Sequence, residues 1–322
     1  KNISVAVVGA TGVVGREILS ILEQRQFKMA SITLLASQNS AGQVLSVNGV
    51  ATKVQELTES SFDTVDIALF SAGGSVSEKY APIAAKAGAV VIDDSSAFRM
   101  CPDVPLVVPE INSQDLEHHH GIISIPNCVA TPLAMVLWPL HQVNPIRRVI
   151  VDTYQSVSGT GSAAIEELTT QSRQVLAGME VTPQVYPHQI AFNVLPHIES
   201  FLENGYTREE WKLVEETRKI MHAPEMAISA TSVRVPVRVG HSEAVHVDLT
   251  EAMTSGEARD ILANSPGILV VDDPAKNKYP LPTTVEGIDH VLVGRIRADV
   301  SHPGSLALWV SSIIIGLFAG LL

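Results

Sequence analysis

One cysteine and one histidine are the residues of this sequence best suited to covalent chemistry. Cys128 follows Asn127 and precedes a stretch that is helical in composition from Val129 onward. A cysteine at a helix N-terminus has a lowered pKa, because the helix dipole stabilises the thiolate. His241 lies in a glycine turn at the end of a predicted strand, where an imidazole can face a cleft and transfer protons. The pair indicates nucleophilic catalysis by a thiol, although a free cysteine taken alone is typical of a buried core.

The remaining cysteine and histidines do not indicate a metal site. Cys101 is predicted to be a core residue, and neither cysteine has Cys or His neighbours at zinc-binding spacing. The run His118, His119 and His120 is predicted to be a solvated turn. We therefore expect no bound metal. Two cysteines are also too few for a disulfide framework, and they fit a reducing compartment.

A glycine-rich turn near the start of the sequence indicates nucleotide binding. The segment that contains Gly9, Gly12 and Gly15 follows a predicted strand at residues 3–8 and opens a predicted helix at residues 13–22. Glycines let the backbone approach a pyrophosphate, and the helix N-terminus supplies N–H donors. The spacing is G-x-x-G-x-x-G rather than G-x-G-x-x-G, but the strand–turn–helix context supports the interpretation.

The turn after the next predicted strand favours NADP over NAD. It reads Ser37, Gln38, Asn39 and Ser40, without the Asp or Glu that would bond the ribose 2′-hydroxyl of NAD. Hydroxyl and amide groups can bond a 2′-phosphate, and no carboxylate repels it. The turn has no arginine to clamp that phosphate, so tolerance of NAD stays open.

The first half of the chain predicts an α/β fold with a doubly wound, Rossmann-like parallel sheet. Short β-branched runs alternate there with helical stretches. Such a sheet binds ligands at the carboxyl ends of its strands. Beyond the first strand and helix, the expected elements are strands at residues 32–35, 67–70 and 90–92 and a helix at residues 76–87.

The second half predicts an α+β domain on a mostly antiparallel sheet. Thr207, with Glu210 three residues later, predicts a capping box at a helix start. We expect an NADP-binding domain at residues 1–127, to which residues 306–322 return, and a catalytic and dimerisation domain at residues 128–305. The expected elements are strands at residues 149–154, 232–239 and 244–249 and helices at residues 162–177 and 208–221.

Composition excludes several classes of protein. The chain has 322 residues, 46% of them apolar, which excludes low-complexity disorder and suits two domains. A net charge of −12 without a basic block argues against a nucleic-acid partner.

The C-terminal residues 305–322 contain no charged side chain, and their number reaches the minimum length of a membrane-spanning helix. Glycines and serines interrupt this apolar run, however. We therefore expect a strand at residues 306–310 and a buried helix at residues 313–322. Because the first apolar run leads straight into the glycine turn, we expect a cytoplasmic protein without a signal peptide.

Eight segments, in order along nearly the whole chain, resemble the aspartate-β-semialdehyde dehydrogenase family. The resemblance implies NADP-dependent reduction of β-aspartyl phosphate to aspartate β-semialdehyde through a cysteine thioester. It also implies a role in lysine, threonine and methionine biosynthesis, and a homodimer or homotetramer assembled through the second domain. The segments are residues 9–15, 95–99, 108–112, 126–128, 154–161, 208–212, 234–242 and 294–297.

The same resemblance implies roles for the residues that act on the substrate. Cys128 is implied as the nucleophile and His241 as the acid/base. Gln155 is implied to orient the substrate, and Asn127 to position the cysteine or polarise the acyl oxygen.

Charged side chains are implied to bind the substrate ends, and further residues to bind the cofactor. Arg234 matches the residue that grips the α-carboxylate, and Glu209 the one that pairs with the α-amino group. Arg99 and Lys212 match the phosphate-binding cations. The implied cofactor-binding residues are Gly9, Thr11, Gly12, Val13, Val14, Ser37, Asn39, Ser40, Ser71, Gly73, Ser158 and Gly159.

The chain departs from the family pattern at three places. Val129 and Ala130 stand where the family usually has Ser-Thr, and Asn39 where it usually has an arginine. After Ser311 the chain lacks the usual Asp-Asn pair and the Lys-Gly-Ala-Ala stretch. Two alternatives stay open: an N-acetyl-γ-glutamyl-phosphate reductase, which would typically have Gly-Cys and would not need Glu209, and a non-catalytic relative.

Overall fold

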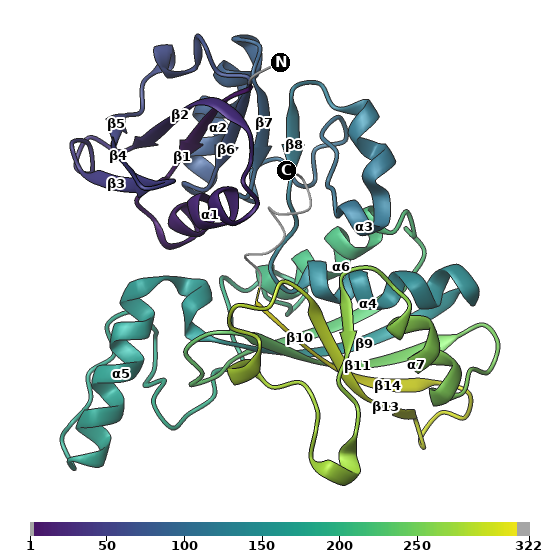
Figure 1. Cartoon of the computed structure of the whole chain (residues 1–322). Coiled ribbons are helices and arrows are strands. Elements are labelled where there is room, and N and C mark those ends of the chain that lie inside the picture. The colour runs from purple at the N-terminus through teal and green to yellow at the C-terminus, as the bar shows by residue number, and fades with distance from the viewer. Residues whose placement is uncertain (1–2, 314–322) are drawn as a thin grey trace. The chain divides into compact units, whose positions relative to one another are not determined.

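The computed structural model describes residues 3–313, which divide into two compact units (Figure 1). Among the described residues, the first unit contains 3–127 and the second contains 128–313. The division therefore falls between Asn127 and Cys128.

The first unit is built on a six-stranded parallel sheet with the order β5-β2-β1-β6-β7-β8. The strand order reverses at β1, as it does in nucleotide-binding sheets. Strands β3 and β4 form a separate antiparallel pair. The elements are β1 (Ile3–Val8), α1 (Val13–Gln24), β2 (Met29–Ala36), β3 (Val44–Val47), β4 (Val50–Lys53), β5 (Gln55–Glu56), β6 (Ile67–Phe70), α2 (Gly74–Lys86), β7 (Val90–Asp93), α3 (Pro109–Asn112) and β8 (Ile122–Ser124).

Successive residues of β1 belong to two different hydrophobic cores, one on each face of the sheet. Val5 and Val7 share one core with Ile18 of α1. Ala6 shares the other core with Ala81 of α2. Because neighbouring strand side chains point to opposite faces, helices cover both faces of this sheet. The predicted doubly wound fold is confirmed.

The second unit is built on a six-stranded mixed sheet with the order β10-β9-β11-β14-β13-β12. Its three inner pairs are antiparallel, and its two outer pairs are parallel. The predicted α+β class is confirmed. The elements are α4 (Ala130–Val143), β9 (Ile146–Gln155), α5 (Ser162–Leu176), α6 (Arg208–Ile220), β10 (Ala227–Arg234), β11 (His241–Leu249), α7 (Ser255–Ala263), β12 (Ile268–Val270), β13 (Val291–Ala298) and β14 (Leu306–Ser312).

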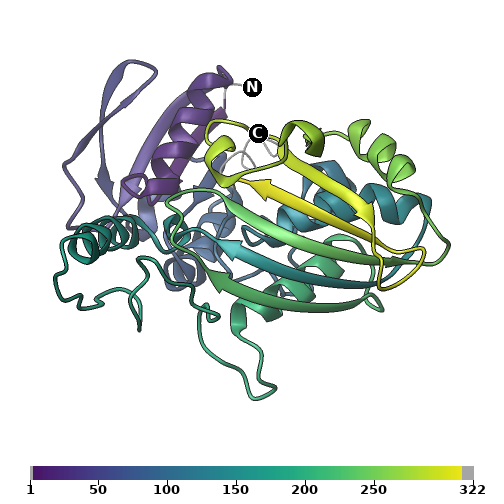
Figure 2. The same ribbon diagram turned by 90° about the horizontal axis from the view of Figure 1, so that it is seen from below.

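Helices α4, α6 and α7 lie on one face of the second sheet (Figures 1 and 2). Helix α4 contacts both of the others and also strands β9, β13 and β14. On β11, Val245 and Val247 are fully buried, whereas Ala244 and His246 are only half-buried. The described part of the second unit places no α-helix on the opposite face, and α5 stands apart from the sheet in both views.

The strand predicted at residues 232–239 is shorter than expected. Strand β10 runs over Ala227–Arg234, and residues 235–239 are irregular. Pro236 has no N–H to donate to a neighbouring strand, so it cannot continue the ladder. This end of the strand places Arg234 at the edge of the candidate site described below.

The C-terminal segment differs from the expectation in its partner. The predicted strand is confirmed as β14, but β14 pairs with β11 and β13 of the second sheet. Residues 306–312 therefore do not return to the first unit, and that part of the predicted domain division was wrong. From residue 314 on, the predicted C-terminal helix lies outside the described residues. Within residues 3–313, none of the helices combines the length and the apolar character that crossing a membrane requires.

A buried glutamate ties the N-terminus of α6 to the sheet. The Oγ1 of Thr207 accepts from the N–H of Glu210 at 3.3 Å, and Glu210 Oε2 accepts from the N–H of Thr207 at 2.6 Å. The predicted capping box is thus confirmed. Glu210 Oε1 also accepts from the backbone N–H of Ser232 on β10 at 2.9 Å. One carboxylate therefore fixes the first turn of α6, which carries Glu209 and Lys212, against the strand.

We expect Glu210→Ala to lower the free energy of unfolding of the second unit by about 2–3 kcal/mol, because two buried N–H groups lose their acceptor. Urea unfolding followed by tryptophan fluorescence measures this, since Trp138, Trp211 and Trp309 are the chain's three tryptophans and all lie in the second unit. The control is Glu215→Ala, which breaks a half-exposed pair with Arg218 on the same helix and should cost less than about 1 kcal/mol. Equal losses for the two variants would contradict the bridging role of Glu210.

Candidate active site

The turns after the parallel strands of the first unit carry most of the predicted cofactor residues. Gly9 follows β1, Ser37 follows β2, Ser71 follows β6, and Asp94 follows β7. The carboxyl ends of parallel strands lie along one edge of a sheet, where doubly wound folds bind their ligands. The fold thus brings these turns together along that edge.

The turn between β1 and α1 is shaped by glycines. A Cβ on Gly9 would lie 2.1 Å from the carbonyl oxygen of Ser71, and one on Gly15 would lie 2.1 Å from the carbonyl oxygen of Gly9. Gly9 also has a φ of +86°, which favours glycine. Helix α1 begins at Val13, and its N-cap residue is Gly12, which has no side chain to accept a hydrogen bond from the first N–H groups. Its first N–H groups can therefore bind an anion, as a nucleotide pyrophosphate requires.

The turn after β2 presents polar groups without a carboxylate. Ser37, Gln38 and Asn39 are exposed, and the N–H of Ser40 donates to the carbonyl oxygen of Ser37 at 2.9 Å. The other cofactor residues predicted in the first unit are also exposed or half-buried: Thr11, Gly12, Val13, Val14, Ser40, Ser71 and Gly73.

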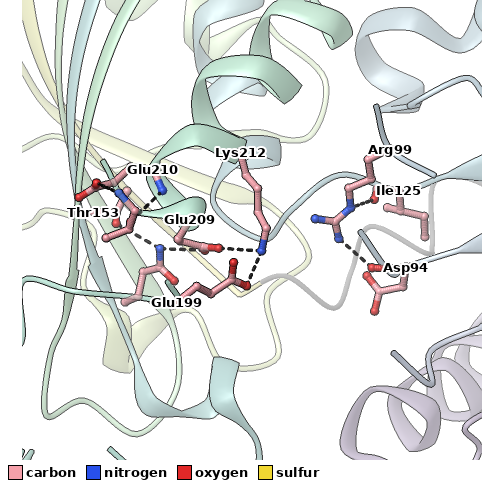
Figure 3. Close-up of polar contacts among 10 residues, drawn as sticks. Asp94, Arg99, Ile125, Thr153, Glu199, Glu209, Glu210 and Lys212 are labelled. Carbon is pink, nitrogen blue, oxygen red and sulfur yellow. Dashed lines mark hydrogen bonds and ion pairs between the residues drawn. The ribbon is translucent and has the colours of Figure 1, made fainter. Parts of the chain in front are cut away.

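Arg99 is buried in the first unit and bonded to two backbone carbonyls (Figure 3). Its Nε donates to the carbonyl oxygen of Ile125 at 2.8 Å, and its Nη2 donates to that of Asp94 at 2.7 Å. Arg99 therefore connects the carboxyl ends of β7 and β8. Burial raises the pKa of the Asp94 side chain to about 6, and this outweighs the opposing effect of the Arg99 charge.

In the second unit, Cys128 lies just before helix α4. The helix begins at Ala130 with Val129 as its N-cap residue. Cys128 is half-buried, whereas Val129 and the preceding Asn127 are buried. The predicted placement of the cysteine before a helix is confirmed, and the helix packs against α6 and β9.

His241 is the first residue of β11, and its ring is held in one orientation by Ser156. Its Nδ1 accepts from the backbone N–H of Ser156 at 2.9 Å and lies 3.0 Å from Ser156 Oγ, which also bonds Ser158 Oγ. In the neutral ring the proton is therefore on Nε2, which is buried without a hydrogen-bond partner among residues 3–313. Burial, together with the positive charge of Arg234, lowers the pKa of His241 to about 4.

Arg234 presents a free edge of its guanidinium close to His241. It ends β10, lies opposite Gln155 in the sheet, and donates from Nη1 to the carbonyl oxygen of Ser156 at 2.7 Å. Its Nε is buried and has no hydrogen-bond partner in the described part of the chain. A Cβ on Gly159 would lie 3.3 Å from Nη1 of Arg234 and 3.4 Å from Nε2 of His241. The backbone of Gly159 therefore packs closely against both side chains, and a larger residue at this position would crowd them.

Gln155, Glu209, Lys212 and Glu199 form a connected polar group in the second unit (Figure 3). Gln155 Nε2 donates to Glu209 Oε1 at 3.2 Å and to Thr153 Oγ1 at 3.2 Å. Lys212 Nζ lies 3.3 Å from Glu209 Oε2 and also contacts Glu199 Oε1. Burial alone would lower the pKa of Lys212, but the two carboxylates outweigh it and raise that pKa. The ammonium is therefore kept charged.

Sequence reasoning missed Tyr186, which lies beside Arg234. The Cζ of Arg234 is 6.0 Å from the centre of the Tyr186 ring, and Tyr186 Oη donates to Thr160 Oγ1 at 2.9 Å. Glu167 of α5 holds this segment by accepting from the backbone N–H groups of Gln184, Val185 and Tyr186. Tyr186 lies in an irregular segment without hydrophobic periodicity, so no sequence pattern predicted its position beside Arg234.

We expect His241 to stay neutral down to about pH 5 and to protonate near pH 4. Its folded-state pKa lies below the ordinary 6.5, so the unfolded chain binds more protons between those values. Above pH 6.5 the ring is neutral in both the folded and the unfolded chain, so its burial does not lower the free energy of unfolding through protonation. As the pH falls from 6.5 towards 4, only the unfolded chain takes up the proton, and the folded state loses stability. NMR titration of the ring Cε1–H, assigned with His241→Gln, measures the pKa. A midpoint at or above 6.5 would contradict the buried neutral ring.

Family models match both units of the chain. A semialdehyde dehydrogenase NAD-binding domain matches residues 4–119, and a semialdehyde dehydrogenase dimerisation domain matches residues 137–312. Together the two matches span most of the chain and follow its division into two units.

Whole-length relatives agree with these matches. An aspartate-semialdehyde dehydrogenase of Aquifex aeolicus is 51% identical over 311 residues, covering 95% of this chain and 91% of the relative. The crystal structure of aspartate semialdehyde dehydrogenase II from Vibrio cholerae has a TM-score of 0.94 and 42% identity, covering 100% of this chain and 96% of that one. The structure of the same enzyme complexed with ASA has a TM-score of 0.94, 40% identity and coverage of 100% and 97%. The family resemblance of the sequence motifs is thereby confirmed: the chain belongs to the aspartate-semialdehyde dehydrogenase family.

Proposed function

We propose that this protein catalyses the NADP-dependent reductive dephosphorylation of β-aspartyl phosphate to aspartate β-semialdehyde. The observation that carries the proposal is the buried group of charges of both signs around His241 in the second unit. Arg234 and Glu209 both act on the pKa of His241, and Lys212 is paired with Glu209. The substrate also has charges of both signs, since it carries an α-carboxylate, an α-amino group and a phosphate. The relatives that are named aspartate-semialdehyde dehydrogenase support the same substrate class.

The free edge of Arg234 suits a carboxylate. Its Nη1 is engaged by the carbonyl oxygen of Ser156, while Nε is unpaired within the described residues. The Nε–Nη2 edge can therefore bind the substrate α-carboxylate through two parallel hydrogen bonds. Glu209 is anchored by Gln155 and is the carboxylate that would pair with the α-amino group.

The phosphate group requires cations, and each unit supplies one candidate. Lys212 in the second unit and Arg99 in the first are buried or half-buried and charged. Arg99 is already oriented by two backbone carbonyls, so little side-chain freedom is lost when it binds an anion. Both residues match the family's phosphate-binding cations.

In the first half of the proposed reaction, the Cys128 thiolate attacks the acyl carbon of β-aspartyl phosphate. A C–S bond forms, the bond from the acyl carbon to the phosphate oxygen breaks, and inorganic phosphate leaves with the electron pair. The product is a thioester on Cys128. Asn127, immediately before the cysteine, would position it or polarise the acyl oxygen. Because Val129 and Ala130 replace the usual Ser-Thr, oxyanion stabilisation rests on backbone N–H groups rather than on side-chain hydroxyls.

In the second half, His241 stabilises the oxygen of the tetrahedral intermediate. The reduced nicotinamide, when bound, would supply the hydride that reduces the thioester carbon and turns the acyl oxygen into an oxyanion. The Nε2–H of neutral His241 would donate a hydrogen bond to that oxygen, because Nδ1 is occupied by the Ser156 N–H. The oxyanion then re-forms the C=O bond as the C–S bond breaks, so that the aldehyde is released and the Cys128 thiolate is regenerated without a net proton.

The residues of the first unit fit NADP. The glycines let the turn pack against the backbone of Ser71 and of Gly9, where a Cβ would collide, and the uncapped N-terminus of α1 offers N–H donors to the pyrophosphate. The exposed turn of Ser37, Asn39 and Ser40 offers hydroxyl and amide donors to a 2′-phosphate and has no acid to repel it. Asn39, at the position of the usual arginine, leaves some tolerance of NAD. Ser158 and Gly159 complete the proposed cofactor contacts from the second unit.

We also propose that the protein is a cytoplasmic homodimer or homotetramer that acts in lysine, threonine and methionine biosynthesis. One face of the second sheet carries no α-helix within residues 3–313, and this face supports the dimer. Tyr154 and Trp309 are half-buried on that face, with ring centres 5.4 Å apart, and would offer an apolar surface to a second copy.

The proposed function is tested by phosphate-dependent reduction of NADP⁺ with aspartate β-semialdehyde, with NAD⁺ measured in parallel. We expect Cys128→Ala to abolish turnover and His241→Ala to slow it by about 10²–10⁴-fold. Cys101→Ala is the matched control and should retain turnover, since Cys101 is the only other cysteine. Full activity in Cys128→Ala would disprove the thioester route. No rate with either cofactor would favour a non-catalytic relative.

We expect Arg234→Lys to raise KM for aspartate β-semialdehyde by at least about tenfold while changing KM for NADP⁺ little. An ammonium cannot grip a carboxylate with two parallel bonds, and it also loses the bond to Ser156. Arg238→Lys is the control, because Arg238 lies four residues along the chain and is exposed. Steady-state kinetics with each substrate varied in turn measure the effect. An equal change in both KM values would refute the carboxylate assignment.

A further inference from the structure

Lys212 is already occupied by a carboxylate that the proposed reaction does not use. Its Nζ contacts Glu199 Oε1 as well as Glu209 Oε2 (Figure 3). Glu199 lies in the irregular segment between α5 and α6, thirteen residues before the lysine. One ammonium is therefore shared between two carboxylates.

The charge of this group is unfavourable for a phosphate. One cation and two carboxylates sum to a net charge of −1, so an incoming phosphate meets net repulsion at the side chain that should attract it. Replacing one carboxylate by the phosphate keeps Lys212 paired and removes that repulsion. One of the two glutamates must therefore give up the ammonium when phosphate binds.

The two glutamates differ in how firmly they are held. Glu209 is 4% exposed, lies on α6, and accepts a hydrogen bond from Gln155. The side chain of Glu199 is 39% exposed and lies in an irregular segment, so water can solvate its carboxylate when it separates from Lys212. Glu199 is therefore the carboxylate that can leave.

We propose that Glu199 is a specificity-determining residue that competes with the phosphate group for Lys212 and so sets the affinity of the site for phosphate. Glu199 acts as an internal anion that keeps Lys212 charged and in place until a phosphate replaces it. This inference rests on the proposed function, in which Lys212 binds the substrate phosphate. It goes further in assigning a role to a residue outside the family motifs.

The test is the KM for inorganic phosphate in the phosphate-dependent oxidation of aspartate β-semialdehyde. Glu199→Gln keeps the size of the side chain but removes its charge, and we expect it to lower KM for phosphate by about threefold to tenfold. KM for NADP⁺ should not change. Glu203→Gln is the matched control, because Glu203 is an exposed glutamate four residues farther along the same segment. It makes the same change in net charge and should leave KM for phosphate unchanged.

Raised salt gives a second readout that a purely structural role would not produce. The ratio of the phosphate KM values of wild type and Glu199→Gln should fall towards one as sodium chloride screens the competing charges. Glu199→Ala repeats the charge removal without an amide and should act in the same direction.

Three outcomes separate this inference from the proposed function. An unchanged or higher KM for phosphate in Glu199→Gln, with wild-type activity that depends on phosphate, would overturn the inference alone and make Glu199 a supporting partner of Lys212. An equal fall in Glu203→Gln would overturn it as well, since the effect would then be one of net charge. Wild-type protein with no phosphate-dependent activity would overturn the proposed function itself.

Discussion

The candidate site of the second unit depends on the bridge that Glu210 makes between helix α6 and strand β10. Its carboxylate accepts backbone N–H groups from Thr207 and Ser232 and so sets where the first turn of α6 meets the sheet. Glu209 is the preceding residue, and Lys212 lies one turn from it on the same helix face. With the turn fixed, Glu209 reaches Gln155 at the end of β9. The capping box is therefore part of the site's geometry as well as of the helix's stability.

Burying this many charges is a cost to folding that the site offsets by pairing. Arg234 is bonded to a carbonyl, and Glu209 lies between an amide and an ammonium. Buried pairs of this kind contribute little net stability compared with apolar residues of similar volume. Their presence is better explained by the ligand. A substrate with charges of both signs requires oriented charges of both signs, and water would weaken them if they were exposed.

The fold was largely predictable from the sequence because the patterns typical of strands and of helices are strong in it. Alternating β-branched runs and helical stretches indicated the parallel sheet, and Thr207 with Glu210 indicated the start of α6. The failures had local causes. Pro236 ends β10 early, and the apolar run at residues 306–312 is explained equally well by either sheet until its partners are known. Helix α7 was not predicted, although Thr254 and Glu257 form the same capping-box signal.

The candidate site was predictable only where chemistry leaves a motif. A nucleophilic cysteine before a helix and a glycine turn have recognisable patterns, and the charged residues followed from the family resemblance. Tyr186 and Glu199 have no such signal, because they lie in an irregular segment whose path is set by tertiary contacts. Glu167 holds one part of that segment, and the backbone of Leu195 pairs with that of Arg234 at another. Residues that act by holding or competing for another side chain are defined by spatial proximity, so only the fold reveals them.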